Sequence, residues 1–305
     1  MLITIIICSY DRRESLARTL DTLALQSRSD AFAVLVIDNN SADGTSEMVE
    51  SRIEDFPVEL RVEVEPTQGL SHARNLGLEI AEGDVVVFID DDVDCPPDFV
   101  SAWTNCFEDP TVAAAGGRIL PRLPEGTPDW LRERLAGRNG GPTSRYDFGD
   151  TPSDIRTEGP HALPFGANMA MRRELARKAG GFRTDLGWGS SGARLVSGEE
   201  TELFTRIQRE GHRIAYCPSA NVVHRIPASR LTSEYLERWY HGYGRASILR
   251  RRPRGWKRIG ILTSAVLDLM QSALTLRRTG SPSKRLTALE QRAKAGGRIA
   301  EIFRR

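Results

Sequence analysis

The chain has 305 residues, of which 40% are hydrophobic and 27% charged, with a formal net charge of +1. This composition is that of an ordinary globular protein, and it excludes disordered, collagen-like and disulfide-rich secreted chains. The opening MLITIIICSY is apolar but has neither a basic leader nor a small-residue cleavage site, so it is predicted to be a strand rather than a signal peptide.

The small net charge hides a strong division along the chain. Residues 245–305 contain 16 Lys and Arg against 3 Asp and Glu, a net charge of +13. Residues 1–244 contain the remaining 26 of 42 basic and 38 of 41 acidic residues, a net charge of −12. An acidic body with a basic tail indicates that the tail faces an anionic surface, either of a protein or of a membrane.

The four cysteines, Cys8, Cys95, Cys106 and Cys217, show no close pairing such as C-x-x-C. Two of them, Cys8 and Cys95, lie beside apolar runs that are typical of strands. We therefore expect four reduced thiols in a cytosolic protein, with neither a disulfide framework nor a zinc site.

The first ninety residues alternate between strand and helix patterns. Apolar, β-branched runs predict strands at residues 2–8, 31–37 and 84–90, and the alternation of apolar and polar residues predicts another at 58–64. Helical spacing of apolar residues predicts helices at residues 12–26, 45–53 and 71–81. Repeated strand–helix–strand units with buried strands indicate a mainly parallel sheet with helices on both faces.

Beyond Pro96 the alternation breaks down. Residues 117–165 are rich in Gly, Pro and Arg, and they are expected to form a long excursion with an amphipathic piece at 130–135. The later elements are predicted as helices at 168–179 and 200–210, each ended by glycine, and short strands at 213–216 and 220–224. The remainder, residues 231–305, is predicted to be mainly helical.

The fourth predicted strand runs directly into three carboxylates, Asp90-Asp91-Asp92. Strand periodicity places Asp90 and Asp92 on one side and Asp91 on the other. Like charges this close are costly unless a cation neutralises them, and ligands of open α/β sheets bind at the carboxyl ends of the strands. We therefore predict Mg²⁺ or Mn²⁺ here, bridging carboxylate to phosphate.

Two other interpretations of this strand end were weighed. Taken alone, three consecutive acids after a strand are also typical of a solvated loop or a turn cap. A dinucleotide site is disfavoured, because no G-x-G-x-x-G follows the first strand.

Five segments, in order, resemble the family 2 glycosyltransferases with the GT-A fold: IIICSYDRRESLARTLDTL, VLVIDNNSADGT, GLSHARNLGLEIAEGDVVVFIDDDV, LPFGANMAMRRELARKAGGF and GEETELFTRIQREGHRIAYCPSANVVH. The resemblance covers roughly residues 2–245. It implies an α/β GT-A fold, a Rossmann-like nucleotide-diphospho-sugar transferase fold with a mainly parallel sheet flanked by helices. The implied division is a catalytic domain at 1–244, with a nucleotide-binding half at 1–116 and an acceptor half at 117–244, and a basic helical extension at 245–305.

The resemblance also implies where the donor binds. Asp38 would hydrogen-bond the nucleotide base, Asp90 would approach the ribose and donor sugar, and Asp92 would ligate the metal that bridges the diphosphate. The full set expected to line the donor pocket is Ser9, Tyr10, Asp11, Asp38, Asn40, Arg74, Asp90, Asp91, Gly166 and Asn168. Asp11 stands where the family often has Asn. The alternative interpretation of Arg74 is a surface arginine on a helix.

The segment Gly198–Leu203 resembles the family motif that carries the catalytic base, with Glu200 in place of the usual Asp. An inverting transfer needs a base that takes the acceptor hydroxyl proton as the oxygen attacks the anomeric carbon. A helix N-terminus favours the ionised carboxylate that this role requires. Glu199 is the alternative base, and acids at this position also serve simply to complement the helix dipole.

Two more residues complete the predicted site. Trp188, in the loop at 187–192, offers an aromatic face to a sugar ring or an apolar acceptor, although a packed tryptophan that steadies the loop explains it as well. His224 follows a β-branched run, where a core histidine is the ordinary interpretation. Similar enzymes have a metal or diphosphate ligand at this place, so His224 is a candidate ligand.

Residues 259–276 are apolar but contain polar positions at 264, 268, 271 and 275, opposite apolar 262, 265, 266, 269 and 273. This spacing predicts an amphipathic helix. Arginine-rich flanks and Trp256 suit a helix that lies on anionic lipid, and packing against protein is the alternative. Nucleic acid is not expected as a partner, because the tail lacks interleaved aromatics and a recognisable binding fold.

The resemblance and the site residues together predict a metal-dependent, inverting glycosyltransferase in glycan, glycolipid or glycoconjugate synthesis. UDP is the first expectation for the nucleotide, with GDP or dTDP as alternatives, and the acceptor is a hydroxyl, either free or lipid-linked. We expect a cytoplasmic protein, either soluble or peripheral on the inner face of the membrane. Two rival functions are a nucleotidyltransferase, which would carry a Gly-rich loop after the first strand, and a non-catalytic scaffold, against which the presence of Glu200 and Asp92 argues.

Overall fold

The structure is a computed structural model that describes residues 1–27, 32–136, 140–156, 163–189 and 196–304. The chain forms two compact units. The first consists of Met1–Arg122, Asn139–Thr184 and Glu199–Ile226, and the second of Leu123–Arg138, Asp185–Gly198 and Pro227–Arg305. The second unit thus begins before the boundary expected at 244/245, which falls inside a helix.

The first unit is built on one nine-stranded sheet. Its strands are β1 (Ile3–Ser9), β2 (Phe32–Asp38), β3 (Leu60–Val64), β4 (Val85–Asp90), β5 (Val93–Asp94), β6 (Val112–Arg122), β7 (Ser153–Ile155), β8 (Asn168–Arg172) and β9 (Arg213–Arg225). The strand order is β3-β2-β1-β4-β8-β6-β9-β5, and β7 pairs with β9. Strands β3, β2, β1 and β4 are parallel, as predicted, whereas β8 runs antiparallel to both of its neighbours. The sheet is therefore mixed.

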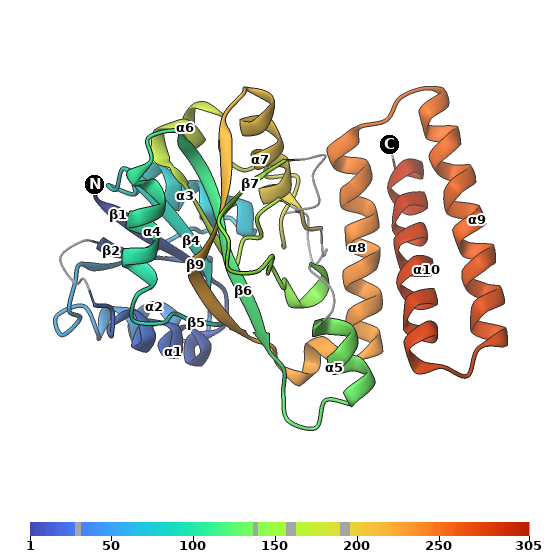
Figure 1. The fold of residues 1–305 in the computed structure, drawn as a ribbon, viewed down its shortest axis with the longest axis horizontal. Coiled ribbons are helices and arrows are strands. Elements are labelled where there is room, and N and C mark those ends of the chain that lie inside the picture. Colours follow the sequence, from blue (N-terminus) through green and yellow to red (C-terminus); the bar gives the residue numbers. More distant parts are fainter. Residues whose placement is uncertain (28–31, 137–139, 157–162, 190–195, 305) are drawn as a thin grey trace. The chain divides into compact units, whose positions relative to one another are not determined.

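The helices of this unit are α1 (Arg13–Leu23), α2 (Thr45–Glu50), α3 (Leu70–Ile80), α4 (Phe99–Glu108), α6 (Arg173–Lys178) and α7 (Glu199–Arg209), with a 3-10 turn η1 (Gly141–Thr143). In Figure 1, α1 and α2 lie on one side of the parallel strands, and α3 and α6 lie on the other. Because both faces are covered, β1 and β4 are buried along almost their whole length.

The predictions for the later strands need correction. The segment Asn168–Arg172, predicted as the start of a helix, is β8, and only Arg173–Lys178 is helical. Its five residues are inserted between β4 and β6, so sheet pairing outweighs their helical propensity. Strand β6 was not predicted at all, because its AAAGG core has neither β-branched residues nor alternation.

The two short strands predicted at 213–216 and 220–224 are one long strand, β9. Residues 217–219, which include Pro218, lie within it. The ladder with β6 instead continues through an irregularity, where the register shifts after Cys217. A β-bulge of this kind absorbs the interruption without ending the strand.

Cys106 of α4 and Cys217 of β9 form a disulfide, so the expectation of four reduced thiols is wrong for this pair. The two cysteines are 111 residues apart in sequence, a separation that carries no pairing signal. They meet because α4 packs against β9. Cys8 and Cys95 are free thiols, as expected.

The second unit contains α5 (Asp129–Ala136), the 3-10 turn η2 (Ala228–Leu231) and three long helices, α8 (Ser233–Arg251), α9 (Trp256–Arg278) and α10 (Pro282–Phe303). The prediction of a mainly helical remainder is confirmed. Helix α10 packs against both α8 and α9 (Figure 1). The approach of α8 to α10 depends on Gly244, since a Cβ there would lie 2.1 Å from the backbone oxygen of Lys294.

Helix α9 keeps only part of the amphipathic division that its sequence predicted: the polar Ser264 and Gln271 are exposed, but so are many apolar side chains. Asp268, assigned to the polar face, pairs instead with Arg298 of α10. The outward side chains between 47% and 78% exposed are Trp256, Ile259, Val266, Leu267, Met270 and Leu274. The helix is apolar on two sides, one of which packs on α10 while the other is exposed, and the sequence pattern did not separate them.

Candidate active site

The candidate site lies at the carboxyl end of β4, where the strand meets its acidic triplet. Strand β4 ends at Asp90, between β1 and β8. Two residues later, β5 pairs antiparallel with β9, and Val93 lies opposite His224. This short pairing brings a histidine from the far end of the sequence beside Asp92.

Asp90, Asp92 and His224 form a cluster that has the composition of a metal site. One possible ligand atom from each residue lies within 4.8 Å of the others. Asp92 and His224 are buried, with 1% of each residue exposed, while Asp90 is partly open to solvent. Asp90 and Asp92 converge here, as strand periodicity predicts, and the Asp91 side chain is held elsewhere by the Ser9 hydroxyl at 2.7 Å.

The hydrogen bonds of His224 fit a cation. Its Nδ1 lies 3.0 Å from the backbone oxygen of Thr143, which only accepts, so Nδ1 carries the hydrogen. Nε2 then lies 3.1 Å from Oδ1 of Asp92 and, without a second proton on the ring, is an acceptor as well. Two acceptors in contact are reconciled only by a proton or a metal ion between them. A carbonyl that orients the second ring nitrogen is also the usual support of a metal-bound histidine.

Arg12 is a residue of the site that the sequence did not reveal. Its guanidinium pairs with Asp91 through Nε at 2.9 Å and with Asp92 through Nη2 at 2.8 Å. Burial raises the pKa of Asp91 to about 7, with Arg12 acting against the rise and Asp92 adding to it. Arg12 thus offsets part of the repulsion in the triplet. The available signal was its place directly after Ser9-Tyr10-Asp11, the loop already assigned to the site.

The residues predicted to meet the nucleotide base lie on two neighbouring loops. Asp38 is buried and accepts hydrogen bonds from the Ser41 amide and the Ser46 hydroxyl. Asp11 accepts from the Ala42 amide at 2.7 Å, which ties the loop after β1 to the loop after β2. Asp38 and Asp11 therefore hold the loop after β2 in place at this edge of the sheet.

Two further residues of these loops are more open. Tyr10 is 47% exposed, and Asn40, which adopts a left-handed backbone with φ of 65°, is exposed as well. They leave side-chain groups available beside the carboxyl ends of β1 and β2.

Arg74 is buried, not a surface arginine of α3. Its Nη1 donates to Glu199 at 2.5 Å, and its Nη2 lies 3.8 Å from Asp90. Burial lowers the pKa of Arg74, but attraction to Glu199 and Asp90 outweighs this and leaves the pKa above its ordinary value. Gly166 borders the guanidinium, and a Cβ there would lie 2.0 Å from Nη2. Arg74 therefore connects the end of β4 to the start of α7.

Glu200 lies in the first turn of α7, beside Glu199. Both are buried, with 8% and 3% of the residue exposed. Burial and the neighbouring Glu199, against the pull of Arg74, together raise the pKa of Glu200 to about 8. A carboxyl group with this pKa is suited to accept a proton near neutral pH. Glu199 forms an ion pair with Arg74 at 2.5 Å.

Asn168 and Trp188 are held by other parts of the fold. The Asn168 amide donates to the backbone oxygens of Arg118 and Ala220, so it joins β8 to β6 and β9. Trp188 belongs to the second unit, where its ring lies against Tyr235 with centroids 6.4 Å apart. Residues 190–192 of the predicted acceptor loop lie outside the described residues.

A family model described as glycosyl transferase family 2 matches residues 4–180, more than half of the chain. The chain belongs to glycosyltransferase family 2. Among curated proteins, a glucosyl-dolichyl phosphate glucuronosyltransferase of Haloferax volcanii is 25% identical over 251 residues, which covers 80% of this chain and 76% of that protein. The succinoglycan biosynthesis protein ExoM of Rhizobium meliloti is 28% identical over 232 residues, covering 75% of this chain and 69% of that protein.

Solved structures show the same fold. The mannosyltransferase PcManGT from Pyrobaculum calidifontis, solved with GDP-Man and Mn²⁺, gives a TM-score of 0.65 at 21% identity, covering 99% of this chain and 87% of that one. Residues 1–349 of S. aureus TarS give a TM-score of 0.57 at 16% identity, covering 100% and 91%. The fold is of GT-A type, and the protein is a glycosyltransferase, as the sequence predicted.

Proposed function

We propose that this glycosyltransferase uses a nucleoside diphosphate sugar and transfers the sugar with inversion to a hydroxyl acceptor. The observation that carries the proposal is the convergence of Asp90, Asp92 and His224 at the carboxyl end of β4. A divalent ion bound to these residues would neutralise the diphosphate that leaves. The structures of related fold solved with GDP-Man and with UDP support a nucleotide donor. UDP is our first candidate, with GDP or dTDP as alternatives.

The ligand set favours Mn²⁺ over Mg²⁺. Mg²⁺ prefers six oxygen ligands and keeps much of its water, whereas an imidazole suits transition metals better. His224 supplies that nitrogen from a buried position, with its ring already oriented by Thr143. The Mn²⁺ in the PcManGT structure supports the same assignment.

In the transfer, the acceptor oxygen forms a bond to the anomeric carbon while the bond from that carbon to the diphosphate oxygen breaks. The acceptor proton passes to the carboxylate of Glu200, and the bonding electron pair leaves with the nucleoside diphosphate. Arg74 pairs with Glu199, and the neighbouring Glu200 has the raised pKa that suits a base. A nucleotidyltransferase is disfavoured by the family, and a scaffold by the buried, high-pKa Glu200.

The test is thermal stabilisation by UDP, GDP, dTDP and their sugars, with and without Mn²⁺. We expect one nucleotide to raise Tm only when Mn²⁺ is present, and Asp92→Asn to abolish that shift. Asp94→Asn is the matched control, since Asp94 pairs with Arg122 and Arg225 outside the cluster. If no nucleotide stabilises the protein, or if Asp92→Asn behaves like the control, the donor site is wrongly placed.

We further propose that α9 lies on an anionic membrane surface. Among the described helices, α9 is the one long and apolar enough to cross a membrane, with a mean hydropathy of 1.5 and only 11% of the window buried. Its exposed apolar row is bordered by Lys257 near one end and by Arg277 and Arg278 at the other, all exposed. Basic ends and an interfacial Trp256 favour a helix that lies in the headgroup plane over one that spans. Flotation with phosphatidylglycerol vesicles, but not with phosphatidylcholine vesicles, is the expected result.

An acceptor linked to a lipid is consistent with that location. The Haloferax volcanii relative is named for glucosyl-dolichyl phosphate. We therefore propose a hydroxyl acceptor on a lipid-linked molecule, with the protein peripheral on the membrane.

A further inference from the structure

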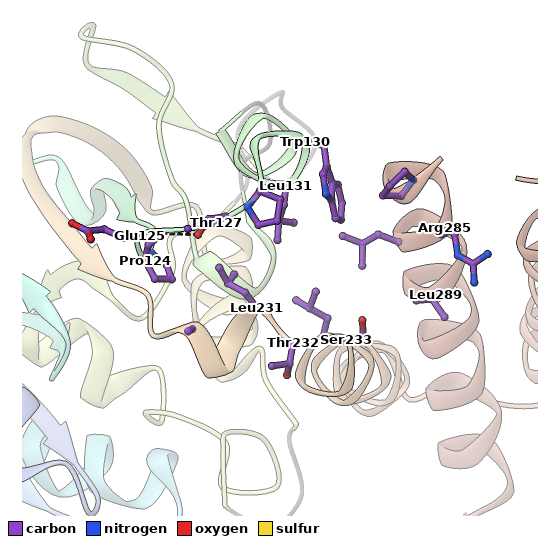
Figure 2. A pocket seen from close by; sticks show the side chains of 16 residues that line it. Pro124, Glu125, Thr127, Trp130, Leu131, Leu231, Thr232, Ser233, Arg285 and Leu289 are labelled. Atoms are coloured by element: carbon purple, nitrogen blue, oxygen red, sulfur yellow. Dashed lines mark hydrogen bonds between the residues drawn. The ribbon is translucent and has the colours of Figure 1, made fainter. Parts of the chain in front are cut away.

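The second unit contains a pocket of about 660 Å³ that is separate from the acidic cluster of the first unit. Its walls come from the start of α10, the start of α8 with η2, and α5 with the loop before it. Figure 2 shows Trp130 and Leu131 on one side and Leu231 and Ser233 on the other. Its volume lies within the range of about 300–1,000 Å³ that is usual for small-molecule sites.

The interior of the pocket is apolar and continuous with a hydrophobic core. Leu131, Leu236 and Leu286 line it and are at most 7% exposed, and with Tyr240 they form the apolar cluster between α5, α8 and α10. Leu289 and Trp130 extend this surface toward solvent. A hydrocarbon group that enters the pocket would therefore be buried against side chains that already face inward.

The hydroxyl groups of the wall are largely committed within the protein. Thr127 donates to the backbone oxygen of Pro124 at 2.7 Å. Thr232 caps α8 by accepting from the Tyr235 amide, and its hydroxyl donates to Ser229. The two threonine hydroxyls are therefore occupied within the protein, and the polar side chains left in the wall are Glu125, Ser233 and Arg285. Between them the lining is apolar and suits a hydrocarbon chain.

The pocket wall contains one acidic and one basic residue. These residues, Glu125 and Arg285, lie toward opposite ends of the view in Figure 2. Arg285 is exposed, has no ion pair with any described carboxylate, and follows Lys284 in the first turn of a 22-residue helix. The positive end of that helix adds to the attraction for an anion. A ligand with an anionic head would therefore orient its head toward Arg285 and its chain toward Leu131.

We infer that this pocket receives the hydrocarbon chain of a lipid phosphate, and that Arg285 pairs with the phosphate. The lipid is the carrier of the acceptor hydroxyl, an assignment that rests on the proposed transfer reaction. The same unit bears the exposed apolar face of α9.

The probe is farnesyl phosphate, which combines one isoprenoid chain with one phosphate. Binding is measured by isothermal titration with the full chain, alongside farnesol, inorganic phosphate and a short-chain phosphatidylglycerol. We expect farnesyl phosphate to bind in the micromolar range, farnesol at least tenfold more weakly, and inorganic phosphate without measurable heat. Tighter binding of phosphatidylglycerol than of farnesyl phosphate would make the occupant a bilayer lipid and overturn the acceptor assignment.

Three charge variants locate the site. Arg285→Glu should weaken farnesyl phosphate binding at least tenfold, and Leu289→Glu should abolish it by placing a charge in the chain region. Arg292→Glu, an exposed arginine two turns further along α10 and outside the pocket, should leave binding unchanged. Equal binding by all three variants, or no binding by the wild type, refutes the pocket. Metal-dependent nucleotide stabilisation measured on the same variants reports separately on the donor site, so the two proposals fail independently.

Discussion

Acidic residues of the candidate site are buried in the first unit, whereas basic residues on α9 are exposed to solvent. Asp91, Asp92 and Glu199 are at most 6% exposed and are compensated from within by Arg12 and Arg74. By contrast, Lys257, Arg277 and Arg278 at the ends of α9 are exposed.

A buried carboxylate is tolerated only with a cation close by, whereas an exposed arginine needs no partner. The difference supports the proposals that the first unit binds a cation and its anionic ligand, and that the second unit meets an anionic surface.

The largest expected effect is that of removing the base. Glu200→Gln should lower kcat by about 100- to 10,000-fold, because the acceptor proton then has no carboxylate to receive it. Nucleotide binding should persist. Glu202→Gln, in the same turn but paired with Arg206, is the control and should retain activity. Equal losses in both variants would mean that the helix start, and not the Glu200 carboxylate, is what matters.

Gly166→Ala tests the buried connection between the end of β4 and α7. The added Cβ would lie 2.0 Å from Arg74 Nη2, so the guanidinium has to move away from Glu199 and Asp90. A displacement of about 1 Å in such a position costs on the order of 100-fold in rate. We expect steady-state kcat to fall by that amount, with the circular dichroism spectrum unchanged. An alanine variant as active as the wild type would show that Arg74 does not position the base.

The pH dependence follows from the raised pKa of Glu200. The base works only when it is deprotonated, so kcat/KM should rise tenfold per pH unit below about 8 and level off above it. The rising limb should disappear in Glu200→Gln. A profile already flat at pH 6 would assign the base to a group with an ordinary carboxylate pKa.

Arg12→Met tests how much the compensation of the buried carboxylates contributes to the stability of the protein. Removing the guanidinium leaves Asp91 and Asp92 buried and adjacent, and it should cost about 1–3 kcal/mol, a discounted figure because Arg12 is 32% exposed. Mn²⁺ with a nucleoside diphosphate should restore part of the loss in urea unfolding. If metal restores none of the lost stability, the carboxylates that pair with Arg12 do not bind the metal.

The smallest effects are expected on α9. Arg277→Gln and Arg278→Gln should each weaken binding to phosphatidylglycerol vesicles by about 1 kcal/mol, roughly fivefold, and high salt should abolish the difference. Arg292→Gln, also exposed but on α10, serves as the matched control. Flotation unaffected by either α9 variant would favour burial of α9 against protein.

The parallel half of the sheet and the acidic cluster were predictable, because they rest on local signals. Strands β1, β2 and β4 are continuous apolar runs and are buried in the sheet, whereas β3 alternates and is partly exposed. Asp90 and Asp92 do converge, although β4 ends at Asp90 and Asp92 lies in the turn that follows.

What could not be predicted depends on contacts between distant residues. Strand β8 is a strand only because β4 and β6 flank it, and the Cys106–Cys217 pair exists only because α4 packs on β9. Arg12 became a site residue by reaching the triplet across about 80 residues of sequence. In α9, the side that packs on α10 cannot be told from the exposed side, because both are apolar.

The central claim is that Asp90, Asp92 and His224 hold the metal that binds the donor diphosphate. The most direct measurement is a titration of Mn²⁺ into the protein with saturating nucleoside diphosphate, in which electron paramagnetic resonance reports the free ion. Wild type and Asp94→Asn should each sequester one Mn²⁺ per chain, and Asp92→Asn and His224→Asn should bind at least tenfold more weakly. If Asp92→Asn sequesters Mn²⁺ as tightly as the wild type, the metal is bound elsewhere and the account is contradicted.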